Sequence, residues 1–225
     1  HAGGNSSAPP DLAMLELGVK SLIAYLFGGL LGSLILGRLR GVDIRCLGSG
    51  NAGATNALRT QGKLFGLGVL LIDAGKGVLA VRYLPGAPWP CADPAVAREW
   101  LTLACALAVI VGHVYPVWFS FRGGKGVATM VGVIGALEPR LLIVVSIAWF
   151  AVLVLTGYVG LASMIAGAAL VAFVYATEPD KVPLLVFCVV IELFVIFTHR
   201  ANIARMLSGK EHRVQKLWLF RSRTA

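Results

Sequence analysis

Long apolar runs alternate with short polar segments along this chain, and the runs define the elements that we expect. Residues 21–37 form the first run, and residues 64–81, 101–121 and 182–198 form three more. At a rise of about 1.5 Å per residue, about 20 residues cross a bilayer, so each run has roughly the length of one transmembrane helix. The pattern therefore predicts membrane-spanning α-helices.

Two further apolar segments do not have the length of one span. Residues 127–137 are too few to cross a bilayer upright, and residues 141–177 are too many for a single helix. We expect the longer segment to break at residues 156–160, where two glycines occur. The chain is therefore predicted to be an all-α integral membrane protein, a bundle of seven transmembrane helices in which one helix is short.

Two charged residues, Asp73 and Lys76, interrupt the second run. A charge at the centre of a transmembrane helix costs roughly 2.5–3.5 kcal/mol on insertion scales, so an unpaired charge there is unfavourable. The two residues lie three positions apart and share one face of a helix, which lets them form an ion pair. We predict that they pair inside the membrane.

The composition is typical of a membrane protein and indicates which class of partner the protein contacts. The 225 residues are 57% hydrophobic and 14% charged, whereas charged residues make up about a quarter of a typical soluble domain. In so apolar a chain, the net charge of +9 indicates contact with anionic membrane lipid rather than nucleic acid. The four cysteines lack CxxC spacing and do not indicate a zinc site or a disulfide framework, and we expect neither a metal nor a cofactor.

The distribution of lysine and arginine predicts the orientation in the membrane. With seven spans, the loop after the first span, the loop at residues 122–126 and the C-terminal segment share one side, and they hold most of the basic residues. Basic loops tend to remain in the cytoplasm. We therefore expect the C-terminus and these polar segments to be cytoplasmic, and the N-terminus to be outside.

The strongest candidate for chemistry lies at residues 112–129. Residues 122–126 read Arg-Gly-Gly-Lys-Gly, so that three glycines surround Lys125. Glycines leave backbone N–H groups uncovered and free to turn toward a small anion, and the lysine adds a cation beside them. The short helix that begins at Val127 would point its N-terminus at the same anion. We interpret this loop as a phosphate-binding site at the membrane surface.

The polar segments also admit other interpretations. Two nucleotide-binding motifs are excluded by the surrounding sequence, and purely structural roles stay open. GSGNAG at residues 48–53 has the spacing of a dinucleotide-binding motif, but an apolar span precedes it where a β-strand is required. A Walker A motif would need glycine at Phe119 and serine or threonine at Gly126. The polar residues near 48–59 also suit a helix cap and turn, and those at 199–213 suit an amphipathic helix end anchored among headgroups.

Three segments resemble the motifs of the bacterial acyl-phosphate:glycerol-3-phosphate acyltransferases, the PlsY family. They are GSGNAGATNALR (48–59), GHVYPVWFSFRGGKGVAT (112–129) and HRANIARMLSGKEHR (199–213). The resemblance implies seven transmembrane helices in the bacterial cytoplasmic (inner) membrane, with an active site formed by cytoplasm-facing loops. It also implies transfer of a fatty acyl group from acyl phosphate to the sn-1 hydroxyl of glycerol 3-phosphate, giving lysophosphatidic acid and phosphate.

The extent of the resemblance sets the expected domain boundaries. We expect a membrane acyltransferase domain at residues 13–213. Residues 1–12 before it are expected to be disordered or not native to the protein. A basic cytoplasmic tail is expected at residues 214–225.

The resemblance also implies roles for individual residues. The catalytic groups would be Ser49, Lys125 and His199. Further residues would bind the two substrates, glycerol 3-phosphate and acyl phosphate: Asn51, Thr55, Arg59, Gly123, Gly124, Gly126, Ser163 and Asn202. A third set would support the site: Arg45, Asn56, Lys76, His113, Arg122 and Glu211.

The expected mechanism does not use a protein base. An acyl phosphate is a mixed anhydride and already activated, so positioning and charge stabilisation are sufficient for catalysis. A His-x4-Asp motif places an aspartate five positions after the histidine, and no histidine in this chain has an aspartate there. The resemblance implies instead that a substrate phosphate oxygen takes the hydroxyl proton. A small transporter of anions or organophosphates is the alternative, because broken helices with glycine loops also occur there.

Overall fold

This computed structural model describes residues 10–88, 98–215 and 218–219, with side chains from residue 14 onward. The chain divides into two compact units, residues 1–137 and residues 138–225. Every regular element in the described part is helical. Each unit is built from long apolar helices joined by short polar segments.

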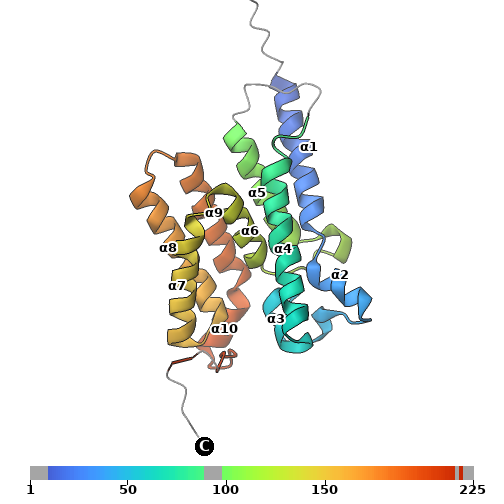
Figure 1. Cartoon of the computed structure of the whole chain (residues 1–225), viewed down its shortest axis with the longest axis vertical. Helices are drawn as coiled ribbons and strands as arrows, with labels where there is room; N and C mark the ends of the chain where they lie inside the picture. Colours follow the sequence, from blue (N-terminus) through green and yellow to red (C-terminus); the bar gives the residue numbers. More distant parts are fainter. Residues whose placement is uncertain (1–9, 89–97, 216–217, 220–225) are drawn as a thin grey trace, which may run out of the picture. The chain divides into compact units, whose positions relative to one another are not determined.

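The described residues of the first unit form six α-helices. Their bounds are α1 Pro10–Gly28, α2 Gly32–Leu39, α3 Ala54–Gln61, α4 Lys63–Tyr83, α5 Arg98–Val114 and α6 Val127–Leu137, with 3-10 turns at η1 Ile44–Cys46 and η2 Val117–Phe119. Within this unit α1, α4 and α5 run side by side, and α6 packs against α4 (Figure 1). The short helices α2 and α3 both pack against α4.

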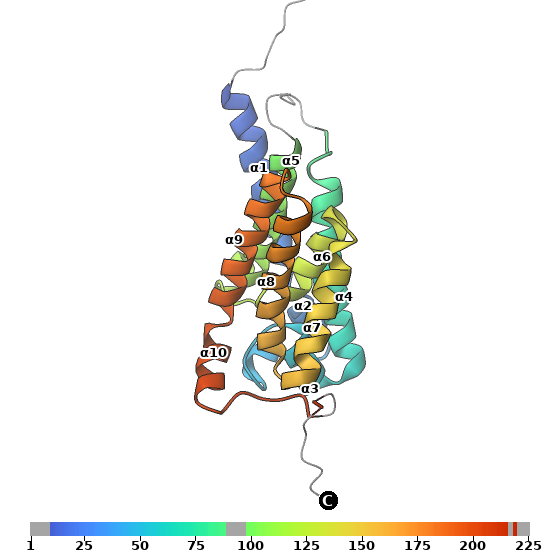
Figure 2. The same ribbon diagram turned by 90° about the vertical axis from the view of Figure 1, so that its left-hand side faces the viewer.

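In the second unit, the part of the chain that the structure describes forms four α-helices. Their bounds are α7 Leu141–Thr156, α8 Val159–Thr177, α9 Val182–Thr198 and α10 Arg200–Leu207. Within this unit α8 packs against both α7 and α9, and α10 continues from the end of α9 at an angle of 53° (Figure 2). Gly157 ends α7 with a φ of 75°, which glycine adopts without strain. The predicted break at residues 156–160 is confirmed.

Most of the predicted helix positions agree with the structure, although α5 ends at Val114 rather than near residue 121. The first span differs more. The helix starts at Pro10 rather than near residue 21, and it stops at Gly28 before α2 begins at Gly32. The two helices are bent by 41° at this break. The prediction of one continuous helix over residues 21–37 is therefore wrong, and the reason is a set of polar contacts to the break that is described below.

The number of membrane crossings depends on how the bent pairs are treated. Among the described residues, α4, α5 and α8 are long and apolar enough to cross a membrane, and up to five spans result if α1–α2 and α9–α10 each count as one. The apolar helices α6 and α7 are shorter. The total of seven spans stays a prediction.

Glycines bring the helices of the first unit into close contact. A side chain at Gly28 or Gly112 would collide with a backbone carbonyl across the α1–α5 contact. A side chain at Gly77 or Gly132 would do the same across the α4–α6 contact. Small residues let helix backbones approach in this way inside a membrane, where packing rather than water exclusion holds helices together.

The segment that follows α10 folds back onto the second unit. The amide of Val214 donates to the carbonyl of Gly157 at 2.8 Å, and that of Leu219 donates to the carbonyl of Val154 at 2.9 Å. The guanidinium of Arg213 also stacks on the ring of Tyr158. The chain therefore remains attached to the second unit beyond residue 213, the boundary predicted from sequence. Residues 1–9 lie outside the described part.

Candidate active site

The loop between α2 and α3 is organised by the buried carboxamide of Asn56. Its Oδ1 accepts a hydrogen bond from the amide of Ser49 at 3.0 Å. Its Nδ2 lies within hydrogen-bond distance of the carbonyls of Ile44, Leu47 and Asn51, at 3.2, 2.9 and 3.0 Å. Asn56 is only 2% exposed, so its polar atoms are used within the loop. The hydrogen bonds of Asn56 therefore hold the backbone of this loop.

The loop held by Asn56 leaves other predicted residues accessible. Ser49, Thr55 and Arg59 are exposed, and Asn51 is half-buried. The hydroxyl of Ser33 donates to the carbonyl of Ala52 at 2.6 Å, which ties the loop to α2. The exposed hydroxyl and guanidinium groups therefore stand on a fixed backbone, which is the condition for binding an anion with preorganised donors.

Arg45 connects this first loop to the second one, which follows α5. Its Nε and Nη2 donate to the carboxylate of Asp43, with the shortest distance at 2.7 Å, and its Nη1 donates to the carbonyl of Phe119 at 3.3 Å. The hydrogen bonds from Arg45 lower the pKa of the Asp43 carboxyl below its usual value. The guanidinium groups of Arg38 and Arg45 also lie 5.8 Å from the centre of the Phe119 ring.

The second loop is anchored to α1 and contains unusual backbone. The hydroxyl of Tyr25 donates to the carbonyl of Tyr115 at 2.7 Å, and the indole of Trp118 donates to the carbonyl of Leu26 at 2.9 Å. Ser120 and Phe121 have φ values of 54° and 59°, in the left-handed region that side chains other than those of glycine rarely adopt. Such conformations persist only where surrounding contacts enforce them.

Two of the glycine amides are used inside the protein. The amide of Gly123 donates to the carbonyl of Val114, and that of Gly124 donates to the carbonyl of His113, both at 3.2 Å. These carbonyls end α5, where a helix leaves acceptors without partners of its own. The prediction that both amides are free to bind an anion is therefore wrong, because the end of α5 needs them.

The second loop leads into α6 through Lys125 and Gly126. Lys125 is half-buried, and Gly126 is buried with a φ of 84°, which turns the chain into α6 at Val127. The first turn of a helix leaves N–H groups without intrahelical partners and carries a partial positive charge. Arg122 is exposed. Lys125 and the start of α6 thus form an electropositive centre within the first unit.

A buried charged cluster lies under the second loop. The Nζ of Lys76 is 3.0 Å from Oδ1 of Asp73, so the predicted ion pair is confirmed. The same Nζ is 2.9 Å from Nδ1 of His113, and all three side chains are at most 3% exposed. Further hydrogen bonds offset the cost of burying these charges, although Oδ2 of Asp73 has no hydrogen-bond partner among the described residues.

The same cluster explains the break between α1 and α2. Lys76 donates to the carbonyls of Gly28 and Leu30 at 2.7 and 3.1 Å. Asp73 accepts from the amide of Gly32, the first residue of α2, at 3.1 Å. Interrupted backbone at membrane depth requires such partners, because lipid offers none.

The predicted residues of the third motif lie in the second unit. His199 is buried, and its Nδ1 is 2.8 Å from the carbonyl of Val195. The amide group of Asn202 donates to Oε1 of Glu211 at 2.7 Å, while Arg205 donates to the other carboxylate oxygen at 2.6 Å. Glu211 therefore orients two side chains of α10.

Ser163 is buried in α8 and is held by its own unit. Its hydroxyl donates to the carbonyl of Val159 at 3.0 Å and accepts from the indole of Trp149 at 3.3 Å. These bonds suit a serine inside an apolar helix. The roles of Ser163, His199 and Asn202 in substrate binding stay predictions.

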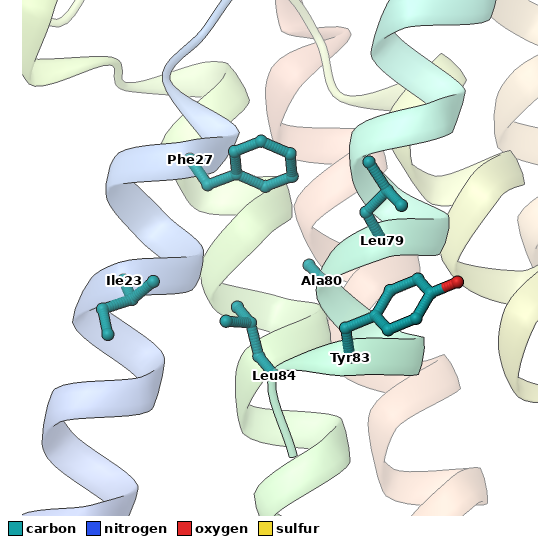
Figure 3. A pocket seen from close by; sticks show the side chains of 6 residues that line it. All are labelled: Ile23, Phe27, Leu79, Ala80, Tyr83 and Leu84. Carbon is teal, nitrogen blue, oxygen red and sulfur yellow. The ribbon is translucent and has the colours of Figure 1, made fainter. Parts of the chain in front are cut away.

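An apolar cavity of about 240 Å³ lies between α1 and α4 (Figure 3). Its lining side chains carry no charge: Ile23, Phe27, Leu79, Ala80, Tyr83 and Leu84. The cavity offers no cation for a phosphate and is separate from the donors described above. In the described part of the chain, no group of three or more His, Cys, Asp or Glu residues could hold a metal ion.

Sequence reasoning missed the contacts that join the loops. Asp43, Phe119 and Ser33 were not among the predicted site residues, although each holds part of the first or second loop. Asp43 lies two residues before Arg45, which is a detectable local signal. Phe119 contacts Arg45 through its carbonyl, and a backbone contact of this kind leaves no trace in the residue type.

Known proteins resemble this chain over most of its length. Residues 19–209 match the family model described as glycerol-3-phosphate acyltransferase. A glycerol-3-phosphate acyltransferase of Sinorhizobium medicae is 42% identical over 213 residues, covering 91% of this chain and 98% of the relative. One from Aquifex aeolicus is 38% identical over 203 residues, covering 87% of this chain and 100% of the relative.

Two solved structures also resemble this chain. Both are crystal structures of PlsY (YgiH), an integral membrane glycerol 3-phosphate acyltransferase, one in its glycerol 3-phosphate form and one in its lysophosphatidic acid form. Each is 35% identical and covers 88% of this chain and 94% of its own, with TM-scores of 0.75 and 0.74. On the sequence match and these structural likenesses together, the chain belongs to the glycerol-3-phosphate acyltransferase family of multi-pass integral membrane proteins, the PlsY family.

Proposed function

We propose that this protein transfers a fatty acyl group from acyl phosphate to the sn-1 hydroxyl of glycerol 3-phosphate, forming lysophosphatidic acid and inorganic phosphate. The observation that carries the proposal is the electropositive centre of Lys125 and the start of α6, on a loop anchored to α1 and α5. Both substrates and both products carry phosphate. The ligand forms of the related PlsY structures, glycerol 3-phosphate and lysophosphatidic acid, support the acceptor and the product.

The chemistry requires one bond to form and one to break. The sn-1 oxygen of glycerol 3-phosphate attacks the acyl carbon, and the bond between that carbon and the phosphate oxygen breaks. A phosphate oxygen of the substrate takes the proton of the sn-1 hydroxyl, so no protein base is needed. The cleaved phosphate leaves as inorganic phosphate. Lys125 and the α6 N-terminus hold the charge that grows on the leaving phosphate.

The other predicted residues would hold the acceptor in line with the acyl carbon. Ser49, Thr55 and Arg59 are accessible on the loop fixed by Asn56, and they offer hydroxyl and guanidinium donors. His199 and Asn202 are proposed to contribute further polar contacts. Fixing two reactants side by side supplies much of the rate enhancement when the donor is already activated.

Donor specificity tests this proposal directly. Purified protein in lipid nanodiscs should release phosphate and lysophosphatidic acid from glycerol 3-phosphate and palmitoyl phosphate. It should show negligible turnover with palmitoyl-CoA, because the proposed centre binds a phosphate bonded directly to the acyl group. Activity should persist in chelator. Comparable turnover with palmitoyl-CoA, or chelator inactivation that a divalent metal reverses, would contradict the proposed donor and mechanism.

We also propose that the first loop faces the cytoplasm of a bacterial inner membrane. Cys46 is exposed in that loop, whereas Cys105 and Cys188 are buried. A membrane-impermeant thiol reagent should therefore spare Cys46 in intact cells and label it after permeabilisation. Cys91, which lies outside the described residues, should be labelled in intact cells. A variant with Cys46→Ser identifies the labelled position, and labelling of Cys46 in intact cells would reverse the proposed orientation.

A further inference from the structure

We infer that His113 is a positioning residue: its buried imidazole packs against Gly124 and thereby fixes the position of the neighbouring Lys125. The inference rests on the proposed role of Lys125 as a phosphate ligand. It assigns the Asp73, Lys76 and His113 cluster a function in the site, in addition to its part in the helix break.

The ring of His113 has one defined orientation and one consistent tautomer. Its Nδ1 lies 2.9 Å from the Nζ of Lys76, and an ammonium group can only donate. Nδ1 therefore accepts, and the neutral ring carries its proton on Nε2, an assignment that follows from the hydrogen-bond network. The ring is 2% exposed. Its Nε2 edge is consequently turned away from Lys76.

That edge lies directly against Gly124. A Cβ atom added to Gly124 would collide with Nε2 of His113 and would lie 3.1 Å from both Cδ2 and Cε1 of the ring. The backbone reinforces the contact, because the amide of Gly124 donates to the carbonyl of His113 at 3.2 Å. Gly124 is therefore held by both the side chain and the main chain of one residue, and Lys125 follows it immediately.

The ring cannot move aside without breaking other bonds. Lys76, which orients it, also binds Asp73 and the carbonyls of Gly28 and Leu30. These contacts fix Lys76 to α1 as well as to α4. A continuous series of contacts thus runs from the break after α1, through Lys76 and His113, to the loop that carries Lys125.

A pair of size-changing substitutions tests this inference. Gly124→Ala should push the loop off the ring, and a displacement of about 1 Å at a catalytic group lowers the rate by about a hundredfold. His113→Asn keeps an acceptor for Lys76 but removes the ring edge beneath Gly124. The double variant His113→Asn/Gly124→Ala should therefore have a kcat/KM at least tenfold higher than that of Gly124→Ala alone. Gly75→Ala in α4, where an added Cβ meets no atom within 4 Å, is the matched control.

The inhibition constant of inorganic phosphate separates positioning from folding. We expect Gly124→Ala to weaken competitive inhibition by phosphate, and the double variant to restore it, at equal amounts of folded protein. Wild-type kcat/KM in Gly124→Ala would overturn the inference. Rescue confined to the thermal midpoint, with no recovery of kcat/KM or phosphate inhibition, would also overturn it by reducing the contact to a structural one. The proposed role of Lys125 fails separately, if Lys125→Ala keeps wild-type activity, and the proposed function fails if the wild-type protein does not transfer the acyl group from palmitoyl phosphate.

Discussion

Replacement of Lys125 by alanine is expected to reduce kcat/KM by about a hundred- to thousandfold, the usual cost of removing one donor from an oxyanion-type site. Lys125 lies two residues before α6, next to a helix N-terminus whose partial positive charge adds to that of the lysine. Its neighbours on both sides are glycines, so no adjacent side chain can replace it. Steady-state release of phosphate from acyl phosphate, measured on detergent-purified variants with unchanged thermal midpoints, tests this expectation.

Two further variants serve as comparisons for Lys125→Ala. Lys125→Arg should restore only part of the activity, because a planar guanidinium is a poor substitute for a compact ammonium between two glycines. Arg122→Ala should be much milder, since Arg122 is exposed, and its effect should fade as the salt concentration rises. A folded Lys125→Ala enzyme with turnover within a few-fold of wild type would remove the proposed phosphate ligand.

Replacement of Lys76 by methionine is expected to destabilise the protein by about 3–5 kcal/mol, the usual cost of breaking a buried ion pair from one side. The substitution leaves the carboxylate of Asp73 without its counter-ion, and it leaves the carbonyls of Gly28 and Leu30 without a donor. Unfolding of purified protein in mixed micelles, followed by circular dichroism against denaturing detergent, measures the change.

A second substitution distinguishes the buried charge from the lost packing. Adding Asp73→Asn to Lys76→Met removes the unpaired charge and keeps an acceptor for the amide of Gly32. The double variant should therefore be more stable than Lys76→Met alone, although each single substitution is destabilising. Losses that add in the double variant would show that the two side chains do not act as a pair.

The apolar pattern predicted most of the fold because helices inside a membrane follow hydrophobic length. The bounds of α6 and α9 agree with residues 127–137 and 182–198, and α7 and α8 separate at the predicted glycine. The break in the first span was not predictable from residues 21–37 alone. Its partners are Asp73 and Lys76, which lie on another helix and were predicted to pair only with each other.

The glycine pattern predicted where the second loop ends but not its hydrogen bonds. A helix begins at Val127, two residues after Lys125, as the pattern suggested. The pattern could not show that the amides of Gly123 and Gly124 are already bonded, because their acceptors are backbone carbonyls at the end of α5. Asn56 has its donors and acceptor satisfied within the loop, which agrees with the plainer interpretation of a turn.

Membership of an acyltransferase family decides between the two functions that the sequence left open. Broken helices and a glycine loop are compatible with an anion transporter as well as with an enzyme. The family match over residues 19–209 favours the enzyme. The buried charges of α4, which would suggest an ion path in a transporter, instead bind the helix break and His113.

The break between α1 and α2 bears on how the protein is made in the membrane. The carbonyls of Gly28 and Leu30 receive their donor from a lysine that follows 48 and 46 residues later, and the amide of Gly32 binds a carboxylate 41 residues later. When Gly32 is added to the growing chain, neither of these partners has yet been synthesised. The first span therefore reaches its final conformation only after α4 has entered the bilayer beside it, so biogenesis of the two segments is coupled.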